Sequence, residues 1–469
     1  MKNDFYYKGF WWLPGHQNEE FSGELVIDSS GRLVLKVIES TKFSKNLKEL
    51  VDNQSMIPLI HGYARDQDTG KDLAFSVFNN FLSSFSIGGL AEYSFQSEFA
   101  TTYKHFETLD SLTFGGAFLE IQLLNEWTNL TGSRDVKQKT GRKLSFTYEY
   151  RQPDPITLYK NKLFHLYLWF YANQKSANNG FELSETVRLN LEFKKPLSYK
   201  ELGSYIELVQ NLMTFCISVP VSVTKVKFHQ NTKSQLKKLG QKHQHTFDLI
   251  ISDNRVFTKQ NGMRESHMLL PFSKISSDPQ LVIGKWFELT QKYQPVFKLY
   301  FDTIYNPSLY KENALLNNVN ALEIYHRITN PNFDGKTDQD YQKQLASILS
   351  KLSAKNEIEW LTTRLVKKKE THLFVRIKNI AERTPIFSKR ILKDIRGFSE
   401  TVSNTRHFLT HFDPSNKEKG VAEGEQLIEL IGKTRLLLQM QLLLDLGLSE
   451  VVADECVRRA ISNWHSWNR

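Results

Sequence analysis

The chain has 469 residues, of which 40% are hydrophobic and 24% charged, so it can bury more than one sizeable core and is not a disordered or fibrous polymer. Its 61 Lys and Arg residues exceed its 51 Asp and Glu residues by a net charge of +10, which points to an acidic or polyanionic partner if the excess is concentrated in one place. Two cysteines, Cys216 and Cys456, are too few for a disulfide framework, and the longest apolar runs are about half of the roughly 18 residues needed to span a bilayer, so we expect a soluble cytoplasmic protein without a membrane partner.

The N-terminal part of the sequence is typical of a β-rich fold. Aromatic residues crowd the stretch from Met1 to Gly15, which predicts a first strand. Apolar residues alternate from Phe21 to Glu39 on both sides of the turn Ser29-Ser30-Gly31, which predicts a β-hairpin. Strands at even spacing favour a sandwich or a barrel. Further runs rich in aromatic and β-branched residues predict strands at Leu73 to Leu82, Glu92 to Phe99, Phe114 to Leu123, Leu144 to Tyr150, Leu163 to Tyr171, Val187 to Phe193, Ile217 to Phe228 and Thr246 to Phe257.

Helical periodicity first interrupts the strands and then replaces them. Apolar residues recur every three or four positions in Ser198 to Phe215 and in Ile283 to Ile304, and the second helix ends before Asn306-Pro307, where we place a domain boundary. The sequence thus predicts an α+β protein in two regions: a β-rich, sandwich or barrel-like domain with inserted helices over residues 1–305, then an all-α helical bundle over residues 306–469. The helices of the second region are predicted at Asn313 to Ile328, Asp340 to Leu352, Glu357 to Lys369, Ile386 to Thr410, Glu423 to Leu446 and Ser449 to Trp467.

Most of the net positive charge lies in one stretch of the helical region. Between Arg364 and Arg396 the sequence has eleven Lys or Arg residues and three acids, a net charge of +8. Such a run is usually a solvated helix face, but it can also be a surface that follows the phosphates of a nucleic acid, and composition alone leaves both open. A second basic stretch, Lys225 to His245, has six lysines, three histidines and no acid, and we expect it to be a mobile loop between strands.

The strongest candidate for chemistry is the segment from Ser403 to Pro414, in which Arg406 is followed by His407 and His411. Phosphate-binding loops, dinucleotide fingerprints, zinc-protease motifs and the nucleophile elbow Gly-x-Ser-x-Gly are all missing from the sequence. His407 and His411 are four residues apart, as metal ligands on one helix face can be, but Asp413 is the only nearby third ligand, so no metal site is predicted.

An Arg followed by a His at this spacing is a weak pattern by itself, and Arg458-Arg459 with His465 also satisfies it. Context favours Arg406, because it lies at the end of an amphipathic stretch and Asp413-Pro414 ends the helix just beyond it. In an ideal helix Arg406 and His411 are about 140° apart, so the Arg side chain must curl, or the helix must loosen, if they share a site. A purely structural alternative pairs Arg406 with a carboxylate and leaves His411 at a helix C-terminus, where a cation is stabilising.

The segment resembles the Arg-x(4–6)-His motif of HEPN (higher eukaryotes and prokaryotes nucleotide-binding) domains, most closely their ApeA-like branch, and a long Leu-rich helix follows it as in that family. The N-terminal region resembles the β-rich domain that precedes HEPN in ApeA-like anti-phage proteins, notably at Phe21-Ser22-Gly23-Glu24-Leu25 and Ile60-His61-Gly62-Tyr63. These resemblances span nearly the whole chain. They imply a sensor or regulatory domain over residues 1–305 and a HEPN ribonuclease domain over residues 306–469 that acts in anti-phage defence by abortive infection.

The resemblance also implies a mechanism, because many HEPN proteins are ribonucleases that act as dimers and need no metal and no cofactor. Three residues of this sequence match the motif. His411 would be the general acid or base, and Arg406 would stabilise the crowded charge of the phosphate. His407 occupies the polar position of the motif and would orient the substrate or the partner histidine.

The partners implied by the resemblance are RNA, with transfer RNA anticodon loops as one target class, a second copy of the chain in a homodimer or higher homo-oligomer, and a phage-encoded trigger for the N-terminal domain. The basic run would follow the RNA backbone through Lys367, Lys368, Lys369, Arg390 and Arg396. The alternative is a non-catalytic RNA- or protein-binding dimerisation protein whose β domain senses a ligand.

Overall fold

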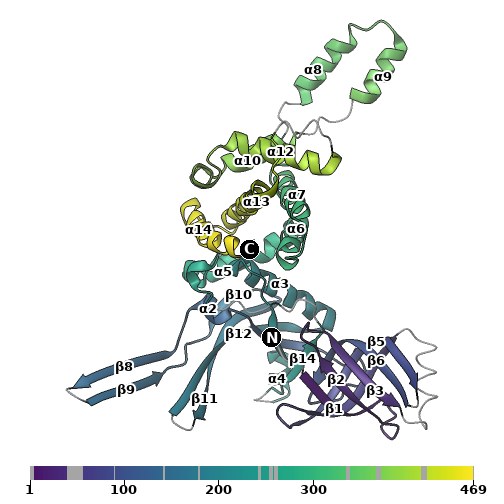
Figure 1. Cartoon of the computed structure of the whole chain (residues 1–469), viewed down its shortest axis with the longest axis vertical. Helices are drawn as coiled ribbons and strands as arrows, with labels where there is room; N and C mark the ends of the chain where they lie inside the picture. The colour runs from purple at the N-terminus through teal and green to yellow at the C-terminus, as the bar shows by residue number, and fades with distance from the viewer. Residues whose placement is uncertain are drawn as a thin grey trace. The chain divides into compact units, whose positions relative to one another are not determined.

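The structure is a computed structural model that forms two compact units, Met1–Gly284 and Lys285–Arg469 (Figure 1). The first unit holds the strands and the second is helical, which confirms the prediction of an α+β protein with a β-rich region followed by an all-α bundle. The described residues are 5–39, 56–88, 90–140, 143–177, 180–240, 244–252, 257, 262–333, 338–365, 371–412 and 420–467.

Six antiparallel strands of the first unit close into a barrel, and Figure 1 shows them curled around one another. The alternation that predicted the hairpin places Leu25 and Leu35 inside, where they are fully buried with Trp11 and Phe95. Each of the six strands pairs with two others of the ring, so this part is a closed barrel and not the sandwich that the sequence also allowed. Around the ring they are β1 (Phe5–Trp12), β2 (Phe21–Ile27), β3 (Leu33–Glu39), β6 (Leu90–Thr102), β5 (Asp72–Gly88) and β4 (Met56–Asp66), which pairs with β1 again.

The barrel continues through β6 into a longer sheet. Its further strands, in spatial order from β6, are β14 (Phe247–Ile251), β13 (Val223–His229), β7 (Phe114–Ile121), β12 (Gly180–Leu197), β11 (Phe164–Ala177) and β10 (Ile156–Lys160). A separate two-stranded sheet pairs β8 (Ser133–Thr140) with β9 (Lys143–Tyr150). The helices and 3-10 turns among and after these strands are α2 (Leu124–Thr128), α3 (Tyr199–Ile217), α4 (Lys233–Lys238), η1 (Glu265–His267) and η2 (Phe272–Lys274).

Helix α3 confirms the predicted switch from strand to helix near residue 198. It begins after Ser198, whose side chain forms a reciprocal capping box with Glu201. It ends at Ser218, which adopts left-handed backbone angles. The strand expected to begin at Ile217 therefore begins only at Val223, because Ile217 is still part of the buried helix.

The second unit is a bundle built around α13 (Gly424–Asp445), which packs against α7 (Lys311–Thr329) and α14 (Glu450–Trp467). Leu437, Leu438 and Met440 on this helix are fully buried, as expected for the central helix of a bundle. Among the residues that the structure describes, no helix is both long and apolar enough to cross a membrane. The boundary between the units falls within α5 (Pro279–Lys292). The other described helices of the second unit are α6 (Gln294–Tyr305), α8 (Asp338–Leu349), α9 (Lys355–Leu365), α10 (Leu373–Glu382), α11 (Pro385–Phe387), the π-helical turn η3 (Ser388–Leu392) and α12 (Ile395–His411).

A half-buried carboxylate bound by two buried phenols joins the end of α13 to its neighbours. Asp445 accepts hydrogen bonds of 2.9 Å from the hydroxyl groups of Tyr293, just before α6, and Tyr325 on α7. Burial, together with the Asp445 charge, raises the pKa of both phenols, so they remain proton donors. The bundle is therefore joined by polar bonds as well as by apolar packing.

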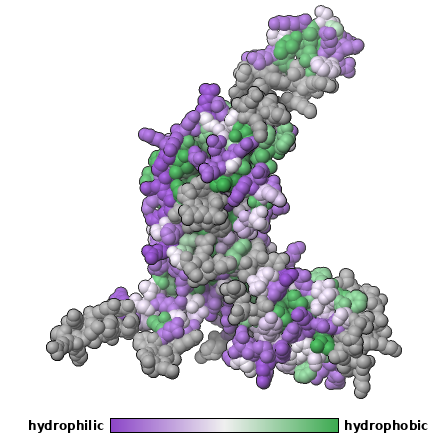
Figure 2. Space-filling view, in the orientation of Figure 1, coloured by the Kyte–Doolittle hydropathy of each residue, from purple (hydrophilic) through white to green (hydrophobic). Residues whose placement is uncertain are grey.

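The hairpin of α8 and α9 carries exposed apolar side chains. Ile348 is 50% exposed and Trp360 is 56% exposed. Figure 2 shows hydrophobic residues among hydrophilic ones on this hairpin. The contacts within the hairpin therefore leave part of its apolar surface uncovered.

The chain divides earlier than the sequence indicated. The division falls between Gly284 and Lys285, whereas we expected it at Asn306-Pro307. Helix α6 packs against α7, and the ring of Phe297 meets that of Trp286 edge-on, so α6 is part of the bundle. The apolar face of α6 was predicted, but sequence periodicity does not show which core such a face joins.

The single helix expected from Ile386 to Thr410 is broken in the structure. The turns α11 and η3 come first, and Lys393, with φ 64° and ψ −60°, then separates them from α12. A residue with these angles cannot continue a right-handed helix. Helix α10, which the sequence analysis did not predict, lies before this break.

Replacing Gly62 by Ala tests the closure of the barrel. A Cβ atom there would lie 2.2 Å from the ring of Trp11, which is fully buried opposite Gly62 on the paired strand β1. We expect Gly62→Ala to lower the free energy of unfolding by about 1–3 kcal/mol. Gly203→Ala in α3 is the control, because nothing lies within 4 Å of its added methyl group. Urea unfolding followed by tryptophan fluorescence compares the two, and equal stability of both variants would contradict the close approach of β1 and β4.

Candidate functional site

The candidate site lies at the C-terminal end of α12, and one buried face of this helix determines its position. Phe398, Val402, Thr405 and Phe408 are buried at intervals of three or four residues. This face packs against α10 and α7. The side of α12 away from this packing carries the histidines of the motif, whose side chains are exposed, and we call it the open face of α12.

His407 and His411 lie together on the open face of α12. Both side chains are exposed, and their ring centroids are 4.7 Å apart with the ring planes at 49°. Arg406 is half-buried and lies on a neighbouring face. The structure therefore brings the two histidines together, whereas Arg406 lies on a different side of the same helix.

Helix α12 remains regular through His411 and does not loosen around the motif. Arg406 and His411 therefore stay about 140° apart around the helix axis. The helix ends at Phe412, which has φ 53° and is 78% exposed. The Phe412 ring stacks on that of Phe408 with centroids 5.3 Å apart. The left-handed residue gives the helix a sharp end directly after the second histidine.

Arg406 differs from the other arginines that matched the sequence pattern. Arg458 pairs with Asp454 at 3.6 Å, and Arg459 pairs with Glu455 at 3.1 Å. Within the described part of the chain, Arg406 forms no ion pair with a carboxylate. Of these three arginines, Arg406 is therefore the one without a carboxylate partner among the described residues.

The residues predicted to bind RNA have different surroundings. Lys367, Lys368 and Lys369 lie outside the described residues. Arg390 pairs with the buried Asp454 and so joins η3 to α14. Arg396 is 79% exposed and pairs with Glu400 at 2.9 Å. Both arginines are thus already paired with carboxylates. This pairing reduces what the two arginines can contribute to binding RNA phosphates.

Another arginine of the basic run is part of the core. Arg376 on α10 is buried, and its Nη1 donates a hydrogen bond of 3.2 Å to Nδ1 of His326 on α7. Nε2 of His326 in turn lies 3.1 Å from Oδ1 of Asn379. Burial lowers the pKa of His326, which favours the neutral ring that this arrangement requires. The sequence analysis missed this network because its members are far apart in the chain and have no motif.

The described residues contain no group of three His, Cys, Asp or Glu side chains arranged to hold a metal ion. Asp413, the third ligand considered for the two histidines, lies outside the residues that the structure describes. An imidazole can donate and accept both protons and hydrogen bonds, so the adjacent rings of His407 and His411 are chemically suited to proton transfer.

Comparison with known families agrees with this division of the chain. Residues 6–286 match the model of ApeA N-terminal domain 1, and residues 316–452 match the model of the Apea-like HEPN domain. The second match includes all of α12. The chain matches no curated protein and no solved structure. The two matches support a defence effector that carries a HEPN nuclease domain.

Replacing Thr405 by Val tests what holds the end of α12 in place. The buried Thr405 hydroxyl accepts a hydrogen bond of 3.0 Å from the backbone N–H of Ala422, just before α13. We expect Thr405→Val to lower the free energy of unfolding by about 1–3 kcal/mol, because a buried N–H loses its partner, and Thr405→Ser to restore most of it. Thr410→Val is the control, since the Thr410 hydroxyl is exposed and donates its hydrogen bond to the backbone oxygen of Arg406. Urea unfolding measures all three, and a Thr405→Val variant as stable as Thr410→Val would contradict this role.

Proposed function

Because the chain belongs to the ApeA-like family and carries its HEPN domain, we propose that it is a metal-independent endoribonuclease that stops phage growth by abortive infection. The observation that carries this proposal is the contact of His407 and His411 on the open face of α12. Arg406, without a described carboxylate partner, supplies a permanent positive charge beside them. These three residues contain the functional groups that cleavage of RNA by its own 2′-hydroxyl requires.

The proposed reaction is an internal displacement at phosphorus. One imidazole removes the proton from the ribose 2′-hydroxyl, and the 2′-oxygen forms a bond to the adjacent phosphorus. The bond from phosphorus to the 5′-oxygen breaks, and that oxygen receives a proton from an imidazolium. We assign the proton transfers to His411, the stabilisation of the phosphate charge to Arg406, and the orientation of the substrate or of the partner histidine to His407.

We propose that the working site is formed by two copies of the chain. Arg406 and His411 of one helix are about 140° apart around its axis, so one regular helix does not direct both at the same phosphate. In a homodimer or higher oligomer, the α12 helix of a second copy would place its motif residues on the other side of that phosphate. Single-stranded loops, including transfer RNA anticodon loops, are the substrate class proposed here, because their bases and 2′-hydroxyls are accessible.

In the full protein we propose that the β-barrel unit responds to a phage-encoded trigger and holds the nuclease in check without it. Family membership supports this division of roles. The alternative, a non-catalytic RNA- or protein-binding dimerisation protein, predicts no RNA cleavage under any condition. RNA cleavage by the wild-type protein therefore distinguishes the ribonuclease from the non-catalytic alternative.

His411→Ala is the direct test of the proposed chemistry. We expect its rate of RNA cleavage in EDTA to fall by about 10²–10⁴-fold, as is usual when a general acid or base is lost. Arg406→Ala should fall as well, and Arg406→Lys should recover part of the rate by restoring the charge. His372→Ala, at an exposed histidine of the same unit, is the matched control and should cleave as the wild type does. Cleavage that persists in His411→Ala, or that EDTA abolishes in the wild type, would contradict the proposal.

The triple variant Lys367→Gln, Lys368→Gln, Lys369→Gln tests the proposed RNA-binding role of the basic run. We expect weaker RNA binding and a logarithmic salt slope that is shallower by about 0.7 for each lost contact with single-stranded RNA. The control removes the same number of charges from α8, α9 and the turn between them. It replaces three exposed lysines, Lys343, Lys351 and Lys355, by Gln. Equal slopes for both triple variants, measured by fluorescence anisotropy across a salt series, would show that the basic run is an ordinary solvated surface.

A further inference from the structure

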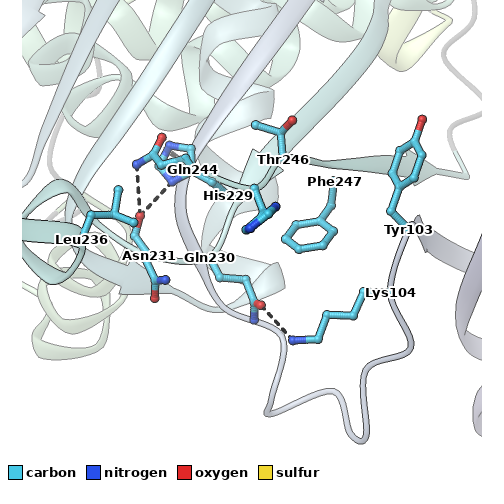
Figure 3. A pocket seen from close by; sticks show the side chains of 10 residues that line it. Tyr103, Lys104, His229, Gln230, Asn231, Leu236, Gln244, Thr246 and Phe247 are labelled. Carbon is cyan, nitrogen blue, oxygen red and sulfur yellow. Dashed lines mark hydrogen bonds between the residues drawn. The ribbon is translucent and has the colours of Figure 1, made fainter. Parts of the chain in front are cut away.

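A cavity of about 550 Å³ lies in the N-terminal unit, away from the motif of α12. Three separate segments form it: the end of β6, the segment after β13 with α4, and the start of β14 (Figure 3). Its volume is within the roughly 300–1,000 Å³ typical of small-molecule sites. The residues that line it are Tyr103, Lys104, His229, Gln230, Asn231, Leu236, Gln244, His245, Thr246 and Phe247.

The cavity accounts for part of the second basic stretch, which the proposed nuclease does not use. The stretch from Lys225 to His245 is not simply the mobile loop that we expected, because it contains most of β13 and the whole of α4, which Thr232 caps. It contributes six of the lining residues, from His229 to His245. The described part of the stretch therefore contributes residues of a strand, a helix and their connections to the wall of the cavity.

Among the described residues, the lining carries positive and neutral groups and no acid. Lys104 forms no ion pair with a described carboxylate, and its Nζ donates a hydrogen bond of 3.3 Å to Oε1 of Gln230. Nearby lysines of the basic stretch are already neutralised, since Lys227 pairs with Asp248 and Lys233 with Glu192. The Nζ of Lys104 also lies 5.0 Å from the centroid of the Phe106 ring. Lys104 is thus the lysine of the lining whose charge no described carboxylate neutralises.

Hydrogen bonds hold the opposite wall in shape. The backbone oxygen of Asn231 lies 2.8 Å from Nδ1 of His229 and accepts a bond of 3.5 Å from Nε2 of Gln244. Figure 3 shows both bonds meeting at this one oxygen. The ring of His229 is buried, and its Nε2 lies 3.6 Å from the buried carboxylate of Glu192. His229 is therefore a fixed part of the wall, and Gln244 and Gln230 border the space with amide groups.

Two aromatic rings border the same space as Lys104 (Figure 3). Tyr103 has φ 72°, an unusual conformation for a bulky residue, and its side chain is 54% exposed. Phe247 is half-buried, with its ring 5.3 Å from that of Phe228. Left-handed backbone at a bulky residue persists only where surrounding structure holds it, and it recurs at binding sites. The wall thus offers a flat apolar surface beside an available ammonium group.

We propose that this cavity binds a free nucleotide. The ammonium group of Lys104 would contact the phosphate, because a charge-assisted bond to phosphate is among the stronger polar contacts. The base would stack on the ring of Tyr103 or Phe247, as bases do on aromatic side chains in single-strand binding proteins. The amides of Gln230 and Gln244 would bond to the ribose or the edge of the base. This site is independent of whether the helical unit cleaves RNA.

Calorimetric titration of the full-length protein tests the site, with ADP, GDP, CDP and UDP added separately as probes. At least one of them should bind, and the matching nucleoside and inorganic phosphate should each bind more weakly, because each lacks half of the contacts. Lys104→Gln should weaken binding about tenfold or more. Tyr103→Asn, which keeps a residue suited to left-handed backbone, should also weaken it. Lys200→Gln, at an exposed lysine of α3 outside the lining, should bind as the wild type does.

Several results would overturn the proposal. They are no binding of any of the four probes, inorganic phosphate binding as tightly as the nucleotide, and unchanged affinity in both Lys104→Gln and Tyr103→Asn. Binding of a short RNA with no binding of free nucleotides would assign the cavity to RNA instead. Circular dichroism of each variant checks that it is folded, and since Lys104 and Tyr103 are both exposed we expect their replacement to leave the fold intact.

Discussion

The packing of one face of α12 against α10 and α7 is the constraint on which the candidate site depends. Phe398, Val402, Thr405 and Phe408 must face the core, and the helical repeat then leaves His407 and His411 on the outside, four residues apart and in contact. The bond from Ala422 to Thr405 fixes the same end of the helix to the start of α13. A change in this buried face would rotate the histidines away from any shared substrate.

The structure shows which of the basic residues behind the net charge of +10 are already paired with other groups. Arg376 belongs to the core with His326, and Arg390 and Arg396 are paired with carboxylates, so the run from Arg364 to Arg396 is less available than its composition indicated. In the N-terminal unit, by contrast, the cavity holds Lys104 without a described carboxylate partner. The availability of a charge therefore depends on its neighbours rather than on the number of basic residues in a segment.

The parts of the fold that the sequence predicted are those set by local periodicity. Alternation predicted the hairpin of β2 and β3, and helical periodicity from Glu423 to Leu446 predicted α13. The break at Lys393 was not predictable, because an ordinary lysine there adopts an unusual backbone. The cavity was also hidden, since Tyr103 and Phe247 are remote in sequence and meet only through sheet pairing. The motif residues were predicted by resemblance, whereas the contact of His407 with His411 follows from helix geometry.

The chemistry of the RNA ends tests the central claim, which is that the imidazoles of α12 promote attack by the RNA's own 2′-hydroxyl. The wild-type protein should be incubated with a single-stranded RNA in EDTA, and the ends of the products identified by mass spectrometry. Our account predicts a 2′,3′-cyclic phosphate on one fragment and a 5′-hydroxyl on the other, because no water molecule takes part in the displacement. Products with a 3′-hydroxyl and a 5′-phosphate would contradict it, since they require an external nucleophile at the phosphorus.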